Sequence, residues 1–168
     1  ISRGLGLGES VAVNGVCLSV VRLRQGLLEF EMVPETQRLT TLGRLRSGSR
    51  VNVEPSLRLC DRLNGHLVLG HVDGTGRITR LRRRGEHVVM ALRMPPALSR
   101  YCVAKGPIAV DGVSLTIGSR RSGTDLEIYL IPDTLRKTIF GERRVGDAVN
   151  LEADYVAKLV GARAVASC

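Results

Sequence analysis

The chain has 168 residues, of which 43% are hydrophobic and 24% charged, and its formal net charge at pH 7 is +9. This composition is typical of a folded globular protein and excludes an intrinsically disordered chain. No apolar stretch reaches the length needed to cross a bilayer and no signal-peptide pattern opens the chain, so no membrane segment is predicted.

The four cysteines, at positions 17, 60, 102 and 168, are too widely spaced for a zinc knuckle or a compact disulfide framework. Free thiols in a reducing cytoplasm are the simplest interpretation. His66 and His71 are five positions apart, which in an extended chain places them on opposite faces, so we predict no metal site.

The positive charge does not gather in one segment. Only Lys105, Lys137 and Lys158 are lysines, and the arginines are scattered over the whole chain. The one dense run, Arg80 to Arg84, is expected at a glycine-containing turn and in contact with solvent. Aromatic residues, which form base-stacking platforms in nucleic-acid-binding proteins, make up only 3% of the chain. We therefore predict no nucleic-acid partner.

The first predicted elements are short strands. Residues 11–21 are rich in β-branched side chains and are interrupted by Asn14-Gly15, a turn-forming pair, which predicts a hairpin. Residues 27–33 alternate roughly apolar and polar, the two-residue period of a half-buried strand. Pro34 is expected to open a short helical turn. A Gly-Ser turn at 48–49 then precedes another strand.

These elements return about a hundred positions later. VAVNGVCLSV at 11–20 returns as IAVDGVSLTI at 108–117, and the segment 33–56 returns at 131–154. Val11 and Ile108 are 97 positions apart, and Pro34 and Pro132 are 98 apart. One constant period of domain size indicates two copies of a single folding unit. Many short, regularly spaced strands favour antiparallel barrels, and the apolar spacing after residue 154 predicts a helix that needs a partner surface.

The first copy is shorter at its start than the second. Residues 65–107 lead into the repeated signature of the second copy, but only residues 1–10 lead into that of the first. We therefore expect a truncated or processed chain, or one whose leading segment of roughly thirty residues is missing. The predicted domains are residues 1–66, an incomplete first barrel, and residues 67–164, a second barrel that ends in a helix from about residue 154.

The paired VNGVCLSV and VDGVSLTI, the two P-(E/D)-T-x-R segments and the GHLVLGHVDGTG between them resemble riboflavin synthase. The resemblance runs from about Glu9 to Val160 and keeps the order and spacing of the family's motifs. It implies an all-β fold: two similar six-stranded antiparallel Greek-key barrels, the first incomplete here, plus a C-terminal helix that helps to assemble a homotrimer.

The resemblance also implies an activity. Members of the family are transferases that convert two molecules of 6,7-dimethyl-8-ribityllumazine into riboflavin and 5-amino-6-ribitylaminouracil, without a metal or cofactor. The productive site lies between the first barrel of one subunit and the second barrel of a neighbour. Lumazine synthase is a further partner that the resemblance implies.

This chemistry requires a base that removes a proton from the C7 methyl of one lumazine and a nucleophile that attacks C7 of the other. It also requires donors that hold the pteridine edge. By resemblance, the expected catalytic residues are His71, Ser10, Cys17, Asp111 and Lys105. The expected first-barrel substrate residues are Cys17, Leu18, Ser19, Glu31, Met32, Val33, Pro34, Glu35, Thr36, Gly70, His71 and Val72. Those of the second barrel are Lys105, Ser114, Leu115, Thr116, Ile131, Pro132, Asp133, Thr134, Leu135 and Arg136. Asp154 matches a family carboxylate near the start of the helix.

Each assignment has a structural alternative. Without the resemblance, His71 would more often be structural than catalytic. A cysteine such as Cys17 is a common packing residue. Asp111 is equally well a turn former, because Asn14 holds the equivalent place. Lys105 has the alternative of a solvated loop residue, although a rare lysine in an arginine-rich chain slightly favours a specific use.

One alternative function belongs to a different class. The same two-barrel fold serves in light-emitting bacteria as a non-catalytic carrier of lumazine or flavin. A carrier has no reason to keep every reactive group of the enzyme. The joint presence of these groups therefore favours the enzyme: Ser10, Cys17, His71, Lys105, Asp111 and Ser114.

Overall fold

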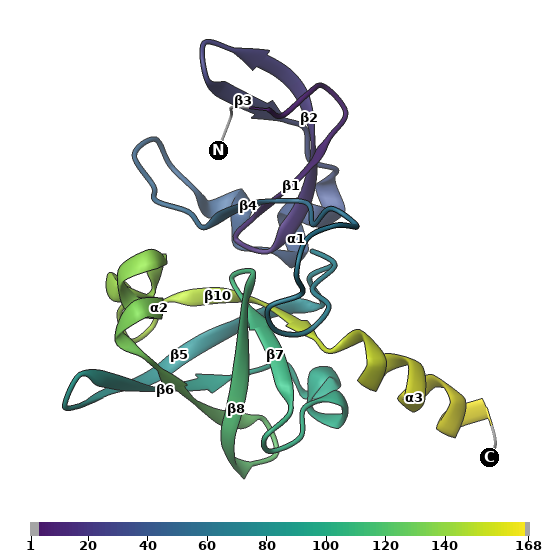
Figure 1. Cartoon of the computed structure of the whole chain (residues 1–168). Helices are drawn as coiled ribbons and strands as arrows, with labels where there is room; N and C mark the ends of the chain where they lie inside the picture. Colours follow the sequence, from purple (N-terminus) through teal and green to yellow (C-terminus); the bar gives the residue numbers. More distant parts are fainter. Residues whose placement is uncertain (1–3, 167–168) are drawn as a thin grey trace.

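The computed structural model describes residues 4–166 and contains two β units, with a helix that projects away from the second (Figure 1). The first unit consists of β1 (Ser10–Val13), β2 (Val16–Arg24), β3 (Leu27–Phe30), α1 (Pro34–Leu39), η1 (Leu42–Arg44) and β4 (Val53–Pro55). The second consists of β5 (Gly74–Arg84), β6 (His87–Arg93), η2 (Pro96–Tyr101), β7 (Pro107–Val110), β8 (Val113–Ser122), β9 (Asp125–Leu130), α2 (Pro132–Lys137), η3 (Ile139–Gly141) and β10 (Ala148–Ala153), and it is followed by α3 (Tyr155–Ala166).

Both units contain the same Greek key. The order β4-β1-β2-β3 in the first unit matches β10-β7-β8-β9 in the second, and in each case the fourth strand returns to lie beside the first. In the second unit β5 and β6 close the sheet into a six-stranded antiparallel barrel. Within residues 4–166 the first unit has no counterpart of these two strands, so its sheet stays open. The predicted all-β fold, with a complete second barrel, an incomplete first one and a C-terminal helix, is confirmed.

The predicted Asn-Gly and Asp-Gly hairpins are also confirmed. Asn14 and Gly15 have φ values of 46° and 76°, and Asp111 and Gly112 have 44° and 81°. Two successive residues with positive φ define a type I′ turn, whose twist suits an antiparallel hairpin. The two hairpins share one register, since the Ser10–Ser19 pair of the first corresponds to Pro107–Thr116 in the second.

Two local predictions need correction. The strand expected over residues 27–33 ends at Phe30, because the chain leaves the sheet in order to start α1 at Pro34. The arginine run belongs to the end of β5, and the turn begins only after it, at Gly85. Arg80, Arg82 and Arg84 therefore share one face of the strand, and Arg83 points to the other.

The two hydrophobic cores differ in size. In the closed barrel, Ile108, Ile117 and Leu151 are fully buried and belong to a cluster that reaches every strand. The core of the open sheet is a smaller cluster built around Val11 and Val20. Because burial of apolar surface is the main favourable term in folding, the second unit carries the larger share of the stability.

The two units meet at their hairpin turns. A Cβ atom added to Gly15 would lie 2.5 Å from the backbone nitrogen of Gly112, and one added to Gly112 would lie 2.7 Å from the backbone nitrogen of Gly15. No side chain fits between backbones this close. Glycine is therefore required at both positions for the contact as well as for the positive φ.

Two equivalent asparagines link the units reciprocally. The amide of Asn52 donates to the carbonyl of Asp111 in the second unit at 2.9 Å, and the amide of Asn150 donates to the carbonyl of Asn14 in the first at 2.9 Å. The Oδ1 atom of each asparagine accepts a backbone N–H from the other unit, at 2.9 and 2.7 Å. Each unit therefore satisfies backbone groups of the other.

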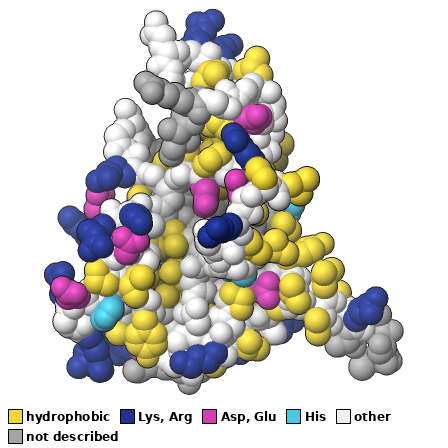
Figure 2. Space-filling model, viewed as in Figure 1, with side chains coloured by type: hydrophobic (Ala, Val, Ile, Leu, Met, Phe, Trp, Pro, Cys, Tyr) yellow, Lys and Arg dark blue, Asp and Glu magenta, His cyan; other side chains and the backbone are white. Residues whose placement is uncertain are grey.

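Helix α3 leaves most of its apolar surface uncovered. Val156, Leu159 and Val160 are each more than half exposed, and Figure 2 shows hydrophobic side chains on the side of the molecule from which this helix projects. The helix touches the second unit at the ring of Tyr101, against which Gly161 packs. Within residues 4–166 no helix is long and apolar enough to cross a bilayer.

Candidate functional site

The hairpin of the first unit brings three predicted site residues onto one face. Ser10 pairs directly with Ser19, and Ala12 pairs with Cys17. Residues opposite each other in an antiparallel pair point to the same face, so Ser10, Cys17 and Ser19 share one. Cys17 and Ser19 are exposed, whereas Leu18 between them points into the core. Leu18 therefore contributes packing rather than a polar contact.

The linker between the units runs along this face. The backbone N–H of Cys17 donates to the carbonyl of Gly70 at 2.9 Å, and a Cβ atom on Gly70 would lie 2.7 Å from that of Cys17. His71 follows Gly70 directly in the chain, and Val72 packs against the core of the first unit. The close approach requires glycine at position 70.

The predicted ring-binding segment 31–36 borders the same face. The β2–β3 ladder ends at the Val20–Phe30 pair, so the chain from Glu31 continues next to Ser19. Val33 caps α1 and is 63% exposed, whereas Met32 packs against the core. Pro34, Glu35 and Thr36 form the first turn of α1.

The second unit carries an equivalent face. Ser114 and Thr116 lie two positions apart on β8 and so point to the same side, while Leu115 packs against the core. Lys105 has a φ of 68°, and its backbone N–H donates to the carbonyl of Ile117 at 2.8 Å, which places this exposed lysine at the end of the face.

The predicted segment 131–136 forms the cap and first turn of α2. Ile131 caps the helix and is half exposed, Pro132 is its first residue and Leu135 packs against the core. A hydrogen bond from Lys137, with help from Arg136, holds the pKa of Asp133 below its usual range. The Asp133 carboxylate is therefore tied within its own helix.

A residue that the sequence did not single out lies against this second face. The Nδ1 atom of His66 is 2.7 Å from the Ser114 hydroxyl, and its Nε2 atom is buried without a hydrogen-bond partner among the described residues. Burial lowers the pKa of His66, and the nearby carboxylates of Asp154 and Glu152 oppose this effect only in part. The imidazole is therefore neutral at pH 7 and able to hold the hydroxyl.

The sequence did contain a pattern that points to His66, because the Gly-His dipeptide occurs twice in GHLVLGH. Gly65 and His66 both contact Ser114 of the second unit, and Gly70, which precedes His71, contacts Cys17 of the first. Ser114 and Cys17 are equivalent positions of the repeat, since they are 97 apart. The linker thus presents the same dipeptide to the same place in both units.

Glu152 fixes the linker and was also missed. Its carboxylate is buried and accepts the backbone N–H groups of Leu69 at 2.8 Å and Gly70 at 3.0 Å. The equivalent residue of the first unit, Glu54, is exposed. The repeat therefore gave no sign that this glutamate has a role.

Asp111 lies away from both faces. It is fully buried at the contact between the units, where one carboxylate oxygen accepts the N–H of Asn150 at 2.9 Å and the other pairs with Arg143. Burial raises its pKa, and Arg143 opposes the rise. Asp154 sits at the start of α3, where its carboxylate accepts the N–H of Val156 at 3.3 Å.

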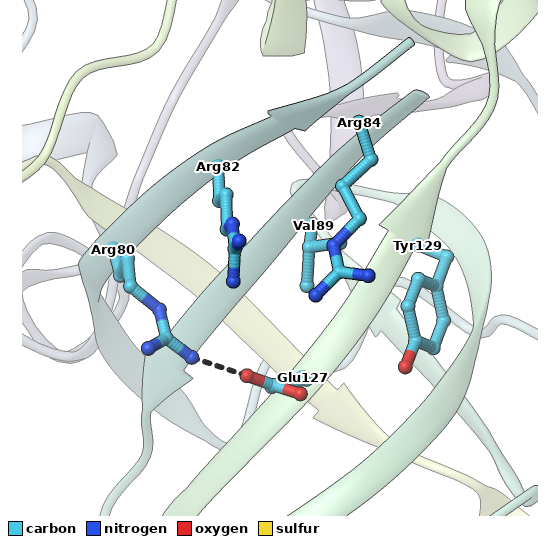
Figure 3. Close-up of a pocket in the computed structure, with 6 residues that line it drawn as sticks. All are labelled: Arg80, Arg82, Arg84, Val89, Glu127 and Tyr129. Carbon is cyan, nitrogen blue, oxygen red and sulfur yellow. Dashed lines mark hydrogen bonds and ion pairs between the residues drawn. The ribbon is translucent and has the colours of Figure 1, made fainter. Parts of the chain in front are cut away.

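A separate hollow lies on the outer face of the barrel (Figure 3). It holds about 120 Å³ between Arg80, Arg82 and Arg84 of β5 and the exposed ring of Tyr129, and Arg80 pairs with Glu127. Sites for drug-sized ligands enclose roughly 300–1,000 Å³, so this hollow is too small for a ribityllumazine. It contains none of the predicted site residues.

Both units match one known domain, described as the lumazine binding domain, over residues 3–56 and 69–154. Over 152 residues the chain is 44% identical to the riboflavin synthase of Bacillus subtilis (strain 168). This alignment covers 90% of this chain and 70% of that protein. Over 164 residues it is 47% identical to the riboflavin synthase of Mycobacterium bovis, with 95% and 81% covered.

Solved structures share the fold. LumP complexed with riboflavin superposes with a TM-score of 0.82 at 22% identity, covering 90% of this chain and 81% of that one. LumP complexed with 6,7-dimethyl-8-(1'-D-ribityl) lumazine gives a TM-score of 0.79 at 21% identity. Fold and domain match together define a two-repeat protein of the lumazine-binding class. The higher identity to the bacterial synthases is more specific, and the chain belongs to the riboflavin synthase family.

Proposed function

We propose that this chain is a riboflavin synthase. It converts two molecules of 6,7-dimethyl-8-ribityllumazine into riboflavin and 5-amino-6-ribitylaminouracil by moving a four-carbon unit from one to the other. The family match carries this proposal, and the duplicated face supports it. The reaction uses two copies of one substrate, and the chain has two equivalent faces, one with Cys17 beside Gly70 and one with Ser114 beside Gly65 and His66.

In this proposal each residue type has a chemical task. His71 accepts the proton from the C7 methyl of the lumazine bound at the first unit. Ser10 or Cys17 supplies the oxygen or sulfur that adds to C7 of the second lumazine. Lys105 donates to the edge of the pteridine. The atoms of two substrate molecules equal those of the two products, so the balance requires no oxidant, metal or cofactor.

Asp111 has a different task in the proposal. Its buried carboxylate already serves Asn150 and Arg143 of the same unit, which supports a role in shaping the turn whose backbone carbonyl accepts the Asn52 amide of the first unit. The proposed domain boundary lies near residue 66, in the linker between β4 and β5.

The two lumazines must meet although the faces belong to different units. We place the productive site between the first unit of one chain and the second unit of a neighbour in a homotrimer. The exposed apolar side chains of α3 at Val156, Leu159 and Val160 support such an assembly. Cytoplasmic localisation and an association with lumazine synthase complete the proposal.

The test is the rise of riboflavin absorbance from the lumazine alone. Loss of a general base typically costs about a hundredfold or more in rate, so His71→Ala should be at least that much slower. His87→Ala, which removes the exposed histidine at the start of β6, is the matched control and should leave the rate unchanged. A protein that binds the lumazine but never converts it would be a carrier instead. If His71→Ala and His87→Ala are equally fast, His71 is not the base.

A further inference from the structure

A larger cavity lies between the two units. It encloses about 570 Å³, within the roughly 300–1,000 Å³ of small-molecule sites. Residues 41–50 of the first unit and 139–148 of the second contribute most of its walls, and Asn14 and Arg77 complete them. None of the residues proposed for the two lumazine faces lines it. We refer to this cavity as the interunit cleft.

The walls of the interunit cleft come from equivalent positions of the repeat but carry different chemistry. Arg44 of the first unit faces the cleft where the second unit has Glu142, and Arg50 where it has Ala148. A feature that the shared fold alone required would be filled alike in both copies. The asymmetry therefore indicates a use that the fold does not dictate.

Part of the charge in the cleft is already neutralised. Arg50 forms an ion pair with Glu142 across the two units. Arg143 pairs with the buried Asp111 at 2.5 Å. These pairs neutralise Glu142 and Asp111, so neither carboxylate is available to the other arginines of the cleft.

The charges of two arginines in the cleft are not balanced by an ion pair with a residue that the structure describes. Arg44 and Arg77 form no ion pair with any residue that the structure describes, and Arg77 donates only to the carbonyl of Gly146, at 2.9 Å. The remaining carboxylate, Asp147, accepts the backbone N–H of Arg144 at 2.9 Å. The cleft therefore has positive charge in excess, with one acidic group at its wall.

Buried polar atoms at the cleft lack partners as well. Thr41 is only 7% exposed, and its Oγ1 atom has no hydrogen-bond partner among residues 4–166. The Nε atom of Arg143 is also buried without a hydrogen-bond partner among these residues. Both atoms are closed off from the solvent in the cleft, so a ligand there meets Arg44 and Arg77 rather than these two atoms.

We propose that the interunit cleft binds a phosphate monoester that also carries hydroxyl groups and has the size of a mononucleotide. The guanidinium fork matches the geometry of phosphate oxygens, which suits Arg44 and Arg77. Asp147 accepts hydrogen bonds from hydroxyl groups of the ligand. The cavity volume fits a molecule larger than phosphate itself.

Calorimetric titration with AMP, in the presence of saturating riboflavin, tests the proposal. AMP should bind and adenosine, which lacks the phosphate, should not. A hydrogen-bonded charge contributes enough that Arg44→Ala and Arg77→Ala should each weaken AMP binding by about tenfold or more. Arg38→Ala removes the same charge from the exposed surface of α1, outside the cleft, and should have no effect.

Three results would overturn the proposal: no heat with millimolar AMP with or without riboflavin, an equal loss of affinity in Arg38→Ala, or AMP binding only when riboflavin is left out. The second would mean general attraction to a basic protein, and the third would mean binding at the lumazine faces. Circular dichroism and riboflavin binding report whether each variant is folded. Should Arg44→Ala unfold, Arg44→Lys keeps the charge but lacks the fork, and it must still weaken AMP binding.

Discussion

Asp111 and Arg143 form a buried ion pair at the contact between the two units, and the first unit replaces both residues at once, with Asn14 and Leu45. Removing one partner of a buried pair typically costs about 3–5 kcal/mol, because the other charge stays buried and unpaired. Arg143→Leu should therefore lower the free energy of unfolding by about that amount, as measured by urea denaturation.

The double variant Asp111→Asn/Arg143→Leu copies the first unit and should be within about 1 kcal/mol of the parent. Asn14 already adopts the required φ of 46° and accepts the N–H of Asn52 just as Asp111 accepts that of Asn150. Burial raises the pKa of Asp111. In Arg143→Leu the folded state therefore binds the proton more tightly, and stability should fall as pH rises above the pKa of the unfolded chain. A double variant as unstable as the single one would contradict this account.

The backbone contact between the hairpin turns predicts a difference between two glycines of the first unit. Gly48 has a φ of 83° and nothing within 4 Å of an added Cβ, whereas Gly15, at 76°, would meet the backbone of Gly112. Gly48→Ala should cost only the backbone strain, about 1–2 kcal/mol. Gly15→Ala should cost about 1–3 kcal/mol more, because the units must separate. Thermal and urea unfolding of the two variants measure this difference, and equal losses would show that the turns do not need to touch.

The contact between His66 and Ser114 predicts a pH dependence. Burial lowers the pKa of His66 below its ordinary value of about 6.5, so the unfolded chain binds the proton more readily. The stability that this contact contributes is then present above about pH 6.5 and is lost as pH falls below it. Urea unfolding of the parent and of His66→Gln should show a difference that shrinks from about pH 7.5 to about pH 5.5. A difference that does not change with pH would mean that the imidazole does not titrate in this range.

The exposure of the cysteines predicts a pattern of alkylation. Cys17 and Cys60 are exposed, whereas Cys102 is buried and burial raises its pKa. Since the thiolate is the reactive form, iodoacetamide should modify Cys102 most slowly. Riboflavin should protect Cys17 in proportion to its occupancy and leave Cys60 unaffected, as read by peptide mass mapping. Protection of Cys60 as well as Cys17 would indicate a global effect of the ligand rather than binding beside Cys17.

Most of the fold could be predicted because its signals are local. Asn14-Gly15 and Asp111-Gly112 specify type I′ turns, and Pro34 and Pro132 start short helices. The strand ending at Phe30 was predicted three residues too long, since alternation of apolar and polar residues continues beyond the last ladder pair.

The candidate site could be predicted only in part. Ser10, Cys17 and Ser19 share a face because of the strand period, which the sequence carries. His66 lies on the linker and contacts Ser114, and Glu152 accepts a backbone N–H of the linker. Both contacts depend on the path of the linker, which no sequence periodicity encodes. Asp111 lies in a hairpin turn, where residues are usually exposed, but the contact between the two units buries it. The sequence of the turn does not reveal that contact.

The reciprocal exchange between Asn52 and Asn150 has the form of an isologous interface, in which each partner offers the other the same surface. Two separate copies of one repeat would associate through such a surface as a symmetric dimer. The tandem chain thus contains a homodimer contact made permanent by a covalent tether. Once both halves lie in one gene, each can change without the other, and the Asp111–Arg143 pair opposite Asn14 and Leu45 marks where the former symmetry has been lost.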